Sequence, residues 1–151
     1  MHLLKVIHGA LVALLLLPLA ACADDSRLVI KSQNGEHGFT VEVVDTPEGY
    51  ARGLMFRQSL APDAGMLFDF KQSREVSFWM QNTFIPLDML FITHDGVIAR
   101  IHVNARPHDT TSIPSGEPVE FVLEVPGGRT VELGIAAGDK VEHPRIADGG
   151  N

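Results

Sequence analysis

The stretch that decides the fold class is DMLFITHDGVIARIHV, residues 88–103. Two runs rich in apolar and β-branched residues flank Asp95-Gly96, a dipeptide typical of the tight turn of a β-hairpin. The stretch therefore predicts two antiparallel strands joined by a two-residue turn. The register that follows predicts these cross-strand pairs: His94–Val97, Ile92–Ala99, Leu90–Ile101, Asp88–Val103, Phe91–Arg100, Met89–His102 and Leu87–Asn104.

This register places Asp88 at the edge of the apolar face of the hairpin, in line with Leu90. A carboxylate in such a position has to be hydrogen-bonded, paired with a cation or protonated. We expect Asp88 to accept backbone N–H bonds from the irregular segment NTFIP, residues 82–86, or to pair with Arg52. The alternative is a general acid or base in a cleft, which makes Asp88 the one weak catalytic candidate.

The rest of the chain also consists of short apolar runs separated by glycine and proline residues. One helix is expected over residues 46–57, with Thr46 as N-cap and Pro47 at the first helical position. We predict a mainly β, small barrel-like antiparallel or mixed domain with one short helix packed on it. The other expected strands cover residues 28–30, 39–44, 66–70, 76–80 and 119–125, with a short last strand near residue 141.

The first residues have the features of an export signal. Residues 1–21 contain one lysine near the start and then an apolar run that is too short to span a bilayer. The run ends in LAAC, which resembles the lipobox of bacterial lipoproteins and predicts lipidation of Cys22. The alternative is cleavage before Asp24, which would release a soluble periplasmic or secreted protein. We expect a lipid anchor and tether over residues 22–27, a single domain over 28–145 and a flexible tail over 146–151.

The composition limits the range of partners. The chain has 151 residues, 45% of them hydrophobic, and a net charge of −7. Its basic residues are scattered, so binding to nucleic acid, which requires neutralised phosphates, is not expected. An anionic membrane surface would repel the chain for the same reason, and the membrane partner is therefore the predicted N-terminal lipid alone.

Several blocks of the sequence resemble one known family. The most distinctive is FWMQNTFIPLDMLFI, residues 78–92, and the match runs in order from about residue 28 to residue 141. The resemblance is to the domain-of-unknown-function 192 family. It implies a compact, mainly β, barrel-like domain that is often exported or membrane-anchored, and it implies no activity. The other matching blocks are RGLMFR (52–57), GMLFDF (65–70), NARP (104–107), VLEVPGG (122–128) and LGIAAGDKV (133–141).

A group of polar residues near Trp79 forms the candidate ligand-binding site. Trp79 lies on the polar face of its expected strand, where it could stack on a flat ligand or be covered by the 46–57 helix. Polar groups that converge beside apolar walls fit a small-molecule pocket, and they also fit local turn chemistry. The predicted ligand-binding residues are Arg52, Trp79, Asn82, Thr83, Asp88 and Asn104.

Other kinds of site are not expected. Each methionine stands alone in an apolar run, and no zinc or phosphate-loop motif occurs, so we predict no metal and no cofactor. Glu120 and Glu124 are assigned to an exposed strand face, about 13 Å apart, too far for a glycosidase pair.

The sequence favours a non-catalytic, membrane-anchored periplasmic lipoprotein that binds a small polar or carbohydrate-like ligand or an envelope protein. Two alternatives remain open. One is an enzyme that uses Asp88 as general acid or base, and the other is a purely structural accessory lipoprotein.

Overall fold

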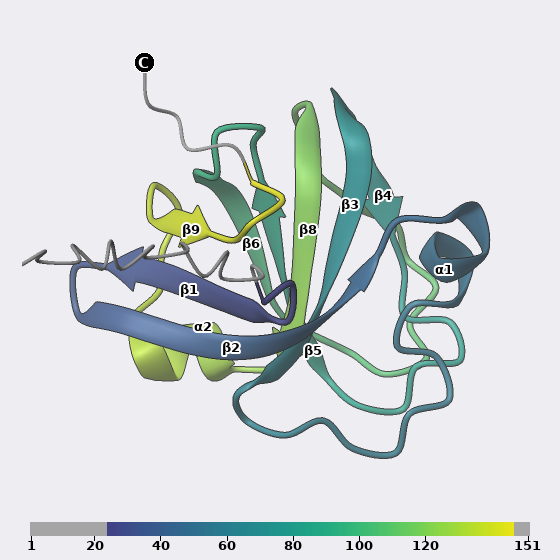
Figure 1. The fold of residues 1–151 in the computed structure, drawn as a ribbon. Coiled ribbons are helices and arrows are strands. Elements are labelled where there is room, and N and C mark those ends of the chain that lie inside the picture. The colour runs from purple at the N-terminus through teal and green to yellow at the C-terminus, as the bar shows by residue number, and fades with distance from the viewer. Residues whose placement is uncertain (1–23, 147–151) are drawn as a thin grey trace, which may run out of the picture.

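The structure is a computed structural model that describes residues 24–146. It is built mainly from strands, with two short helices (Figure 1). The strands are β1 (Arg27–Ser32), β2 (Gly35–Val44), β3 (Ala64–Arg74), β4 (Ser77–Phe78), β5 (Leu87–Ile92), β6 (Ile98–Ala105), β7 (Ile113–Pro114), β8 (Val119–Pro126) and β9 (Lys140–Glu142). The helices are α1 (Pro47–Arg52) and α2 (Arg129–Leu133).

Seven of the strands form one strongly curled sheet. Their order is β6-β5-β8-β3-β2-β1-β9, and all pairs are antiparallel except β2 with β3. In Figure 1, β1 and β2 cross in front of the more upright β3, β5, β6 and β8. A bridge between Val97 and Lys140 joins the two edges of the sheet at one end. The small, mainly β, barrel-like domain predicted from the sequence is thus confirmed.

The central strands of the sheet are buried on both faces. Leu90, Ile92 and Leu123 belong to the hydrophobic cluster on the concave face. Met89 and Phe91 belong to a second cluster on the outer face. Because α1 and the segments around β4 and β7 cover that outer face, β5 is buried along its whole length.

The predicted hairpin is confirmed in its centre and wrong at its ends. Met89 pairs with His102, Leu90 with Ile101 and Phe91 with Arg100, as expected. Irregularities on both sides shift the register, so that Leu87 lies opposite Ala105 and Ile92 opposite Ile98. An extra residue in one strand of an antiparallel pair produces such a shift. The turn is wider than two residues, since the Thr93 N–H donates to the carbonyl of Val97.

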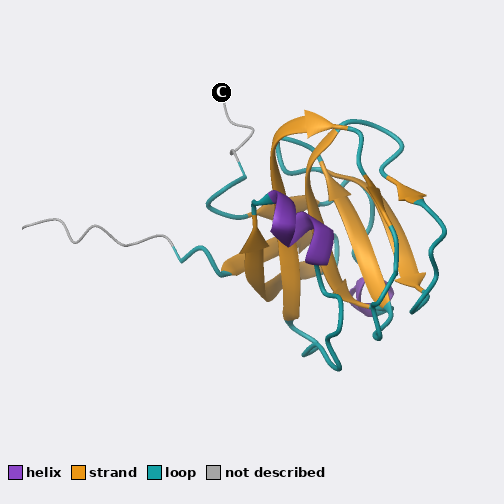
Figure 2. Ribbon diagram, turned by 90° about the vertical axis from the view of Figure 1, so that its right-hand side faces the viewer, coloured by secondary structure: helices purple, strands orange, loops and turns teal. Residues whose placement is uncertain are grey.

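The helix predicted over residues 46–57 is shorter in the structure, where it is α1, Pro47–Arg52. Thr46 caps it as predicted, because its hydroxyl accepts a hydrogen bond from the Gly49 N–H at 3.2 Å. The helix ends at Gly53, whose φ of 45° takes the chain out of helical geometry. Gly53 is also close to the core, since a Cβ there would lie 3.2 Å from the ring of Phe68. Figure 2, turned by 90°, places α1 toward the viewer.

The ends of the described part fit tightly onto the domain. Ser26 accepts a backbone hydrogen bond from Val41, and β1 begins at Arg27. Ile146, at the other end, is buried in the concave cluster. The predicted signal peptide, Cys22 and most of the predicted tail lie outside the described residues. Within residues 24–146, no helix has the length and apolar character needed to cross a membrane.

Candidate functional site

Asp88 is fully buried and accepts four hydrogen bonds. Its Oδ1 atom accepts from the backbone N–H of Asn104 at 2.7 Å and of Gly128 at 2.8 Å. Its Oδ2 atom accepts from the backbone N–H of Thr130 at 2.8 Å and from the Thr130 hydroxyl at 2.6 Å. One carboxylate therefore ties the end of β6 to the first turn of α2.

This arrangement confirms that Asp88 is clamped by backbone donors but corrects which donors it uses. They come from residues 104, 128 and 130 and not from residues 82–86. Among the described residues, Asp88 forms no ion pair with Arg52, which lies exposed on α1. The four donors occupy the acceptor sites of the Asp88 carboxylate.

A cleft opens on the outer face, between α1 and the chain around β4. Its volume is about 490 Å³, and it is floored largely by aromatic rings. Tyr50 contributes from α1, Phe70 from β3 and Phe78 from β4. The Tyr50 ring lies 4.9 Å from the Phe70 ring, centroid to centroid, and the Tyr50 hydroxyl donates to the carbonyl of Asp69 at 2.6 Å. The remaining lining residues are Pro47, Ala51, Arg74, Glu75, Val76, Ser77 and Trp79.

Trp79 stands at the edge of this cleft with 51% of its surface exposed. The alternation expected for its segment is observed, since Ser77 and Trp79 are exposed while Phe78 and Met80 turn inward. Helix α1 lies beside Trp79 and does not cover it. The side chain is thus accessible for stacking, as a ligand-binding role requires.

A smaller cavity of about 30 Å³ adjoins the cleft and shares four of its residues: Tyr50, Ala51, Phe78 and Trp79. Its other walls come from residues 52–55, Phe68 and Thr83, and it reaches Glu124 on β8. The space is large enough for a group the size of one or two water molecules.

Glu124 was predicted to lie on an exposed strand face, and the structure shows it buried. It is only 4% exposed, so its assignment to a solvent-facing strand surface is wrong. Among the described residues no donor or cation contacts its side chain, and burial alone raises its pKa from 4.5 to about 8. The carboxyl group is therefore mostly protonated at neutral pH. The signal was the apolar run FVLEV, residues 121–125, which is typical of a strand buried on both faces.

The structure divides the predicted ligand-binding residues into two groups. Arg52, Trp79 and Thr83 line the small cavity together with Glu124. Asp88 and Asn104 belong to the clamp at the end of β6. The remaining residue, Asn82, is exposed, has a φ of 54° and accepts a hydrogen bond through its carbonyl from the Phe56 N–H at 2.8 Å. Asn82 thus shapes the loop beside the cavity.

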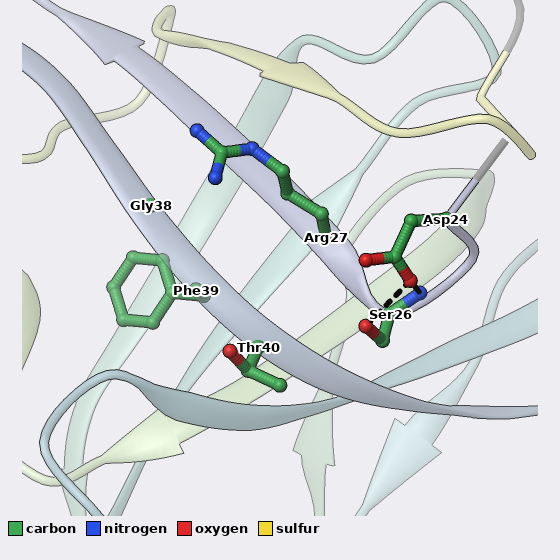
Figure 3. A pocket seen from close by; sticks show the side chains of 6 residues that line it. All are labelled: Asp24, Ser26, Arg27, Gly38, Phe39 and Thr40. Atoms are coloured by element: carbon green, nitrogen blue, oxygen red, sulfur yellow. Dashed lines mark hydrogen bonds between the residues drawn. The ribbon is translucent and has the colours of Figure 1, made fainter. Parts of the chain in front are cut away.

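Two further hollows lie elsewhere. One, of about 290 Å³, is lined by residues 58–60, Ile85, Pro86, Pro126 and Gly127. The other, of about 150 Å³, lies over the start of β1 and the middle of β2 and is drawn in Figure 3. There the Asp24 carboxylate accepts from the N–H and the hydroxyl of Ser26, at 3.0 and 2.7 Å, which lowers its pKa. That acid already has its partners, so the hollow offers less to a ligand than the cleft does.

Two methionines and one histidine lie close together on the sheet beside Glu124. Met66, Glu124, Met89 and His102 are neighbours in one row across the sheet. Among residues 24–146, no group of three or more His, Cys, Asp or Glu residues is arranged to hold a metal ion. Met66 and Met89 are buried in the outer cluster, in keeping with a packing role.

Comparison with known families agrees with the resemblance. The profile of the domain-of-unknown-function 192 family (DUF192), described as an "Uncharacterized ACR", matches residues 29–143. This chain belongs to that family. The match includes Trp79, Asp88 and Glu124, so the cleft and the clamp both lie within the family domain. No curated protein matches the chain.

Two solved structures are similar to this domain. One, from Sinorhizobium meliloti 1021, is described as a "putative transcription regulator". It shares 44% sequence identity and has a TM-score of 0.79, over 83% of this chain and 98% of its own. The other, from Novosphingobium aromaticivorans DSM 12444, is described as a protein of unknown function. It shares 40% identity with a TM-score of 0.75, over 77% of this chain and 83% of its own.

Proposed function

We propose that this chain is a non-catalytic binding domain of the bacterial cell envelope, anchored through a lipid on Cys22, and that it binds a small ring-shaped polar ligand. The observation that carries the proposal is Trp79, half exposed at the edge of an aromatic cleft. A carbohydrate-like ligand fits this site best, because the apolar face of a sugar ring stacks on an indole while its hydroxyl groups remain hydrated.

The cleft has the size and composition of a ligand site. Its volume of about 490 Å³ lies within the range of ~300–1,000 Å³ that is usual for small-molecule pockets. Aromatic side chains supply the walls, and Arg74, Glu75 and Ser77 supply polar groups among them. Arg74 is held in place, since its guanidinium lies 4.9 Å from the centroid of the Phe70 ring.

The site fits binding better than catalysis, because among the described residues neither Asp88 nor Glu124 lies beside an accessible nucleophile that it could activate. Asp88 has its acceptor sites filled by backbone and hydroxyl donors. Two side-chain hydroxyl groups line the small cavity together with Glu124. The Tyr50 hydroxyl donates to the carbonyl of Asp69, and the Thr83 hydroxyl donates to the carbonyl of Gln81 at 3.2 Å. No activated nucleophile lies in the described part of the cleft.

The description of the S. meliloti relative does not extend to this chain. Regulators that bind DNA require a basic surface, because their affinity depends on contacts to phosphate. This chain has a net charge of −7, and its basic residues are scattered. An envelope location agrees better with the signal-like N-terminus and the LAAC sequence at residues 19–22.

The test uses Trp79 as its own reporter, because it is the only tryptophan in the chain. The full-length protein, purified from membranes in detergent, is titrated with a panel of monosaccharides and disaccharides while its emission spectrum is recorded. We expect at least one saccharide to shift the emission and to protect Trp79 from acrylamide quenching.

Trp79→Ala should abolish the binding of that saccharide, measured by calorimetry. Val131→Ala is the matched control, because Val131 is 68% exposed on α2 and does not line the cleft. The proposal is wrong if no saccharide and no fraction of a periplasmic extract changes the emission or the quenching of Trp79.

A further inference from the structure

The small cavity beside the main cleft has an unusual lining. Aromatic rings surround it on several sides, and one carboxyl group lies at its inner end. The Phe68 and Phe78 rings meet edge to face, with centroids 5.1 Å apart. Tyr50 and Trp79 belong both to this cavity and to the cleft, so a ligand in the cleft could extend one group into the cavity.

The carboxyl group of Glu124 has no hydrogen-bond or ion-pair partner among the described residues. Its neighbours across the sheet are Met66 on β3 and Met89 on β5, which donate no hydrogen bonds. No hydrogen bond or ion pair is formed by its side chain within residues 24–146. Replacing a buried, unpartnered carboxyl with a hydrophobic residue would be expected to stabilise the fold. Glu124 is instead buried at a cavity that opens beside the cleft, where a group from outside the protein can reach its carboxyl.

We propose that this cavity binds a primary ammonium group, which the carboxylate of Glu124 pairs with and the aromatic rings surround. The inference rests on the proposed function, because it assigns a chemical class to the ligand of the same cleft. The ligand would carry its amine on a short arm attached to the ring that stacks on Trp79.

An ammonium group fits the cavity in size and in electrostatics. A volume of about 30 Å³ accepts a group about as large as a water molecule. Aromatic faces attract cations, and the same aromatic cluster already holds one, since Arg74 lies over Phe70. The net charge of −7 also favours a cationic ligand over an anionic one.

The other charged and titratable groups near the cavity do not compete for Glu124. Arg52 lines the cavity from α1 but is exposed, and burial is the only cause of the raised pKa of Glu124. The Tyr50 hydroxyl is held by the carbonyl of Asp69. From β3 and β5 the facing side chains are methionine and phenylalanine, and His102 lies beyond Met89 on β6.

Binding would release one proton. In the free protein the carboxyl of Glu124 is protonated up to about pH 8. The bound ammonium keeps its own protons, so the carboxyl loses its proton to solvent as the ion pair forms. Below pH 8 the affinity for an amine should therefore fall about tenfold for each unit of decreasing pH, whereas the affinity for a neutral ligand should not change.

Matched pairs of probes test this directly. Benzylamine, 2-phenylethylamine and 3-phenylpropylamine differ from their alcohols only in the terminal group, and the three lengths allow for different depths of the cavity. The full-length protein is titrated with all six compounds between pH 6 and pH 8.5, by calorimetry and by Trp79 emission. We expect at least one amine to bind tenfold or more tightly than its alcohol at pH 7.5 and to show the pH dependence above.

Glu124→Gln removes the charge but keeps the size of the side chain. In this variant the preference for the amine over its matched alcohol should disappear, together with the pH dependence of amine binding. If Glu124→Gln folds poorly, the pH dependence of amine binding to the wild type still tests the role of the Glu124 carboxyl.

The failures can be told apart. If amines and alcohols shift Trp79 emission with equal affinity, or if Glu124→Gln keeps the preference for amines, the ammonium site is wrong and the cleft stands. If none of the six probes affects Trp79, the ammonium site is wrong, and the saccharide titration alone then decides on the proposed function.

Discussion

Two buried carboxyl groups lie on opposite faces of the same sheet, and their surroundings give them different roles. Asp88 has four donors within 2.8 Å, so its charge is compensated by the fold itself. Glu124 has none among the described residues, so burial raises its pKa to about 8. The first residue stabilises the structure, and the second is the one that we propose pairs with a ligand.

Asp88→Asn should lower the free energy of unfolding by about 3–5 kcal/mol, measured by urea denaturation. The amide nitrogen would face two hydrogen-bond donors and leave them unsatisfied in the core. Asp109→Asn is the control, because Asp109 is exposed and its carboxylate accepts only from Thr111, through the hydroxyl and through the backbone N–H at 2.9 Å, among the described residues. This change should cost less than about 0.5 kcal/mol. A loss below about 1 kcal/mol for Asp88→Asn would show that the clamp contributes little.

Glu124 should make the protein less stable as the pH rises. Its pKa is 4.5 in the unfolded chain and about 8 in the folded one, so the folded state binds more protons between these values. Stability therefore falls from about pH 4.5 to pH 8, by roughly 5 kcal/mol if no relaxation occurs. Glu124→Gln should remove this fall and should melt at a higher temperature than the wild type at pH 9.

Thermal unfolding of the wild type and of Glu124→Gln at each pH provides the comparison. Glu117→Gln, which changes an exposed glutamate, should retain the dependence of the wild type. Parallel curves for the wild type and Glu124→Gln would mean that the carboxyl is ionised at neutral pH.

The environment of Asp88 was predicted in part from the sequence, and that of Glu124 incorrectly. The hairpin register placed Asp88 on the apolar face and anticipated backbone donors. It could not identify Gly128 and Thr130, because β8 and α2 reach Asp88 through tertiary contacts. The apolar run FVLEV, residues 121–125, indicated that Glu124 is buried. Which elements cover the outer face of β8 depends on tertiary contacts, which the local sequence does not show.

At the scale of elements, α1 forms one wall of the cleft through Pro47, Tyr50 and Ala51. The helix is short, so its N-cap should matter for its stability. Thr46→Ala should lower the free energy of unfolding by about 1 kcal/mol, because the Gly49 N–H would lose its side-chain acceptor. Thr110→Ala, in the exposed loop after β6, should be neutral in the same urea experiment, and equal effects of the two changes would contradict a capping role.

The expected length of this helix was wrong for a reason that the sequence contains. Gly53 lies inside the predicted range of residues 46–57, and in the structure it adopts positive φ and ends the helix. Glycine is the residue that tolerates this conformation, so its position was informative. By contrast, the register shifts at the two ends of the β5–β6 pair were not anticipated from the local sequence.

At the scale of the whole molecule, Arg145 joins three parts of the chain. Its guanidinium contacts Asp25 at 2.9 Å, Asp45 at 2.8 Å and Asp69 at 3.3 Å. These acids lie before β1, after β2 and within β3, and the side chain of Asp69 is buried. Since networks of ion pairs contribute more than single pairs, this one should stabilise the curled sheet.

Arg145→Gln should lower the free energy of unfolding by about 1–2 kcal/mol at low salt, and 1 M NaCl should reduce the difference. Glu132→Gln breaks an exposed pair with Arg129 and should change stability by less than about 0.5 kcal/mol. If the two variants unfold at the same urea concentration, the network does not act as a unit.

At this scale, we propose that the β domain carries a ligand in the cleft beside Trp79. Native mass spectrometry of the protein purified gently from its own membranes, alongside Trp79→Ala, tests that claim most directly. We expect an additional small mass on the wild type that is absent from Trp79→Ala and retained by Val131→Ala. A wild type without added mass, or a mass that Trp79→Ala retains, would contradict the proposal.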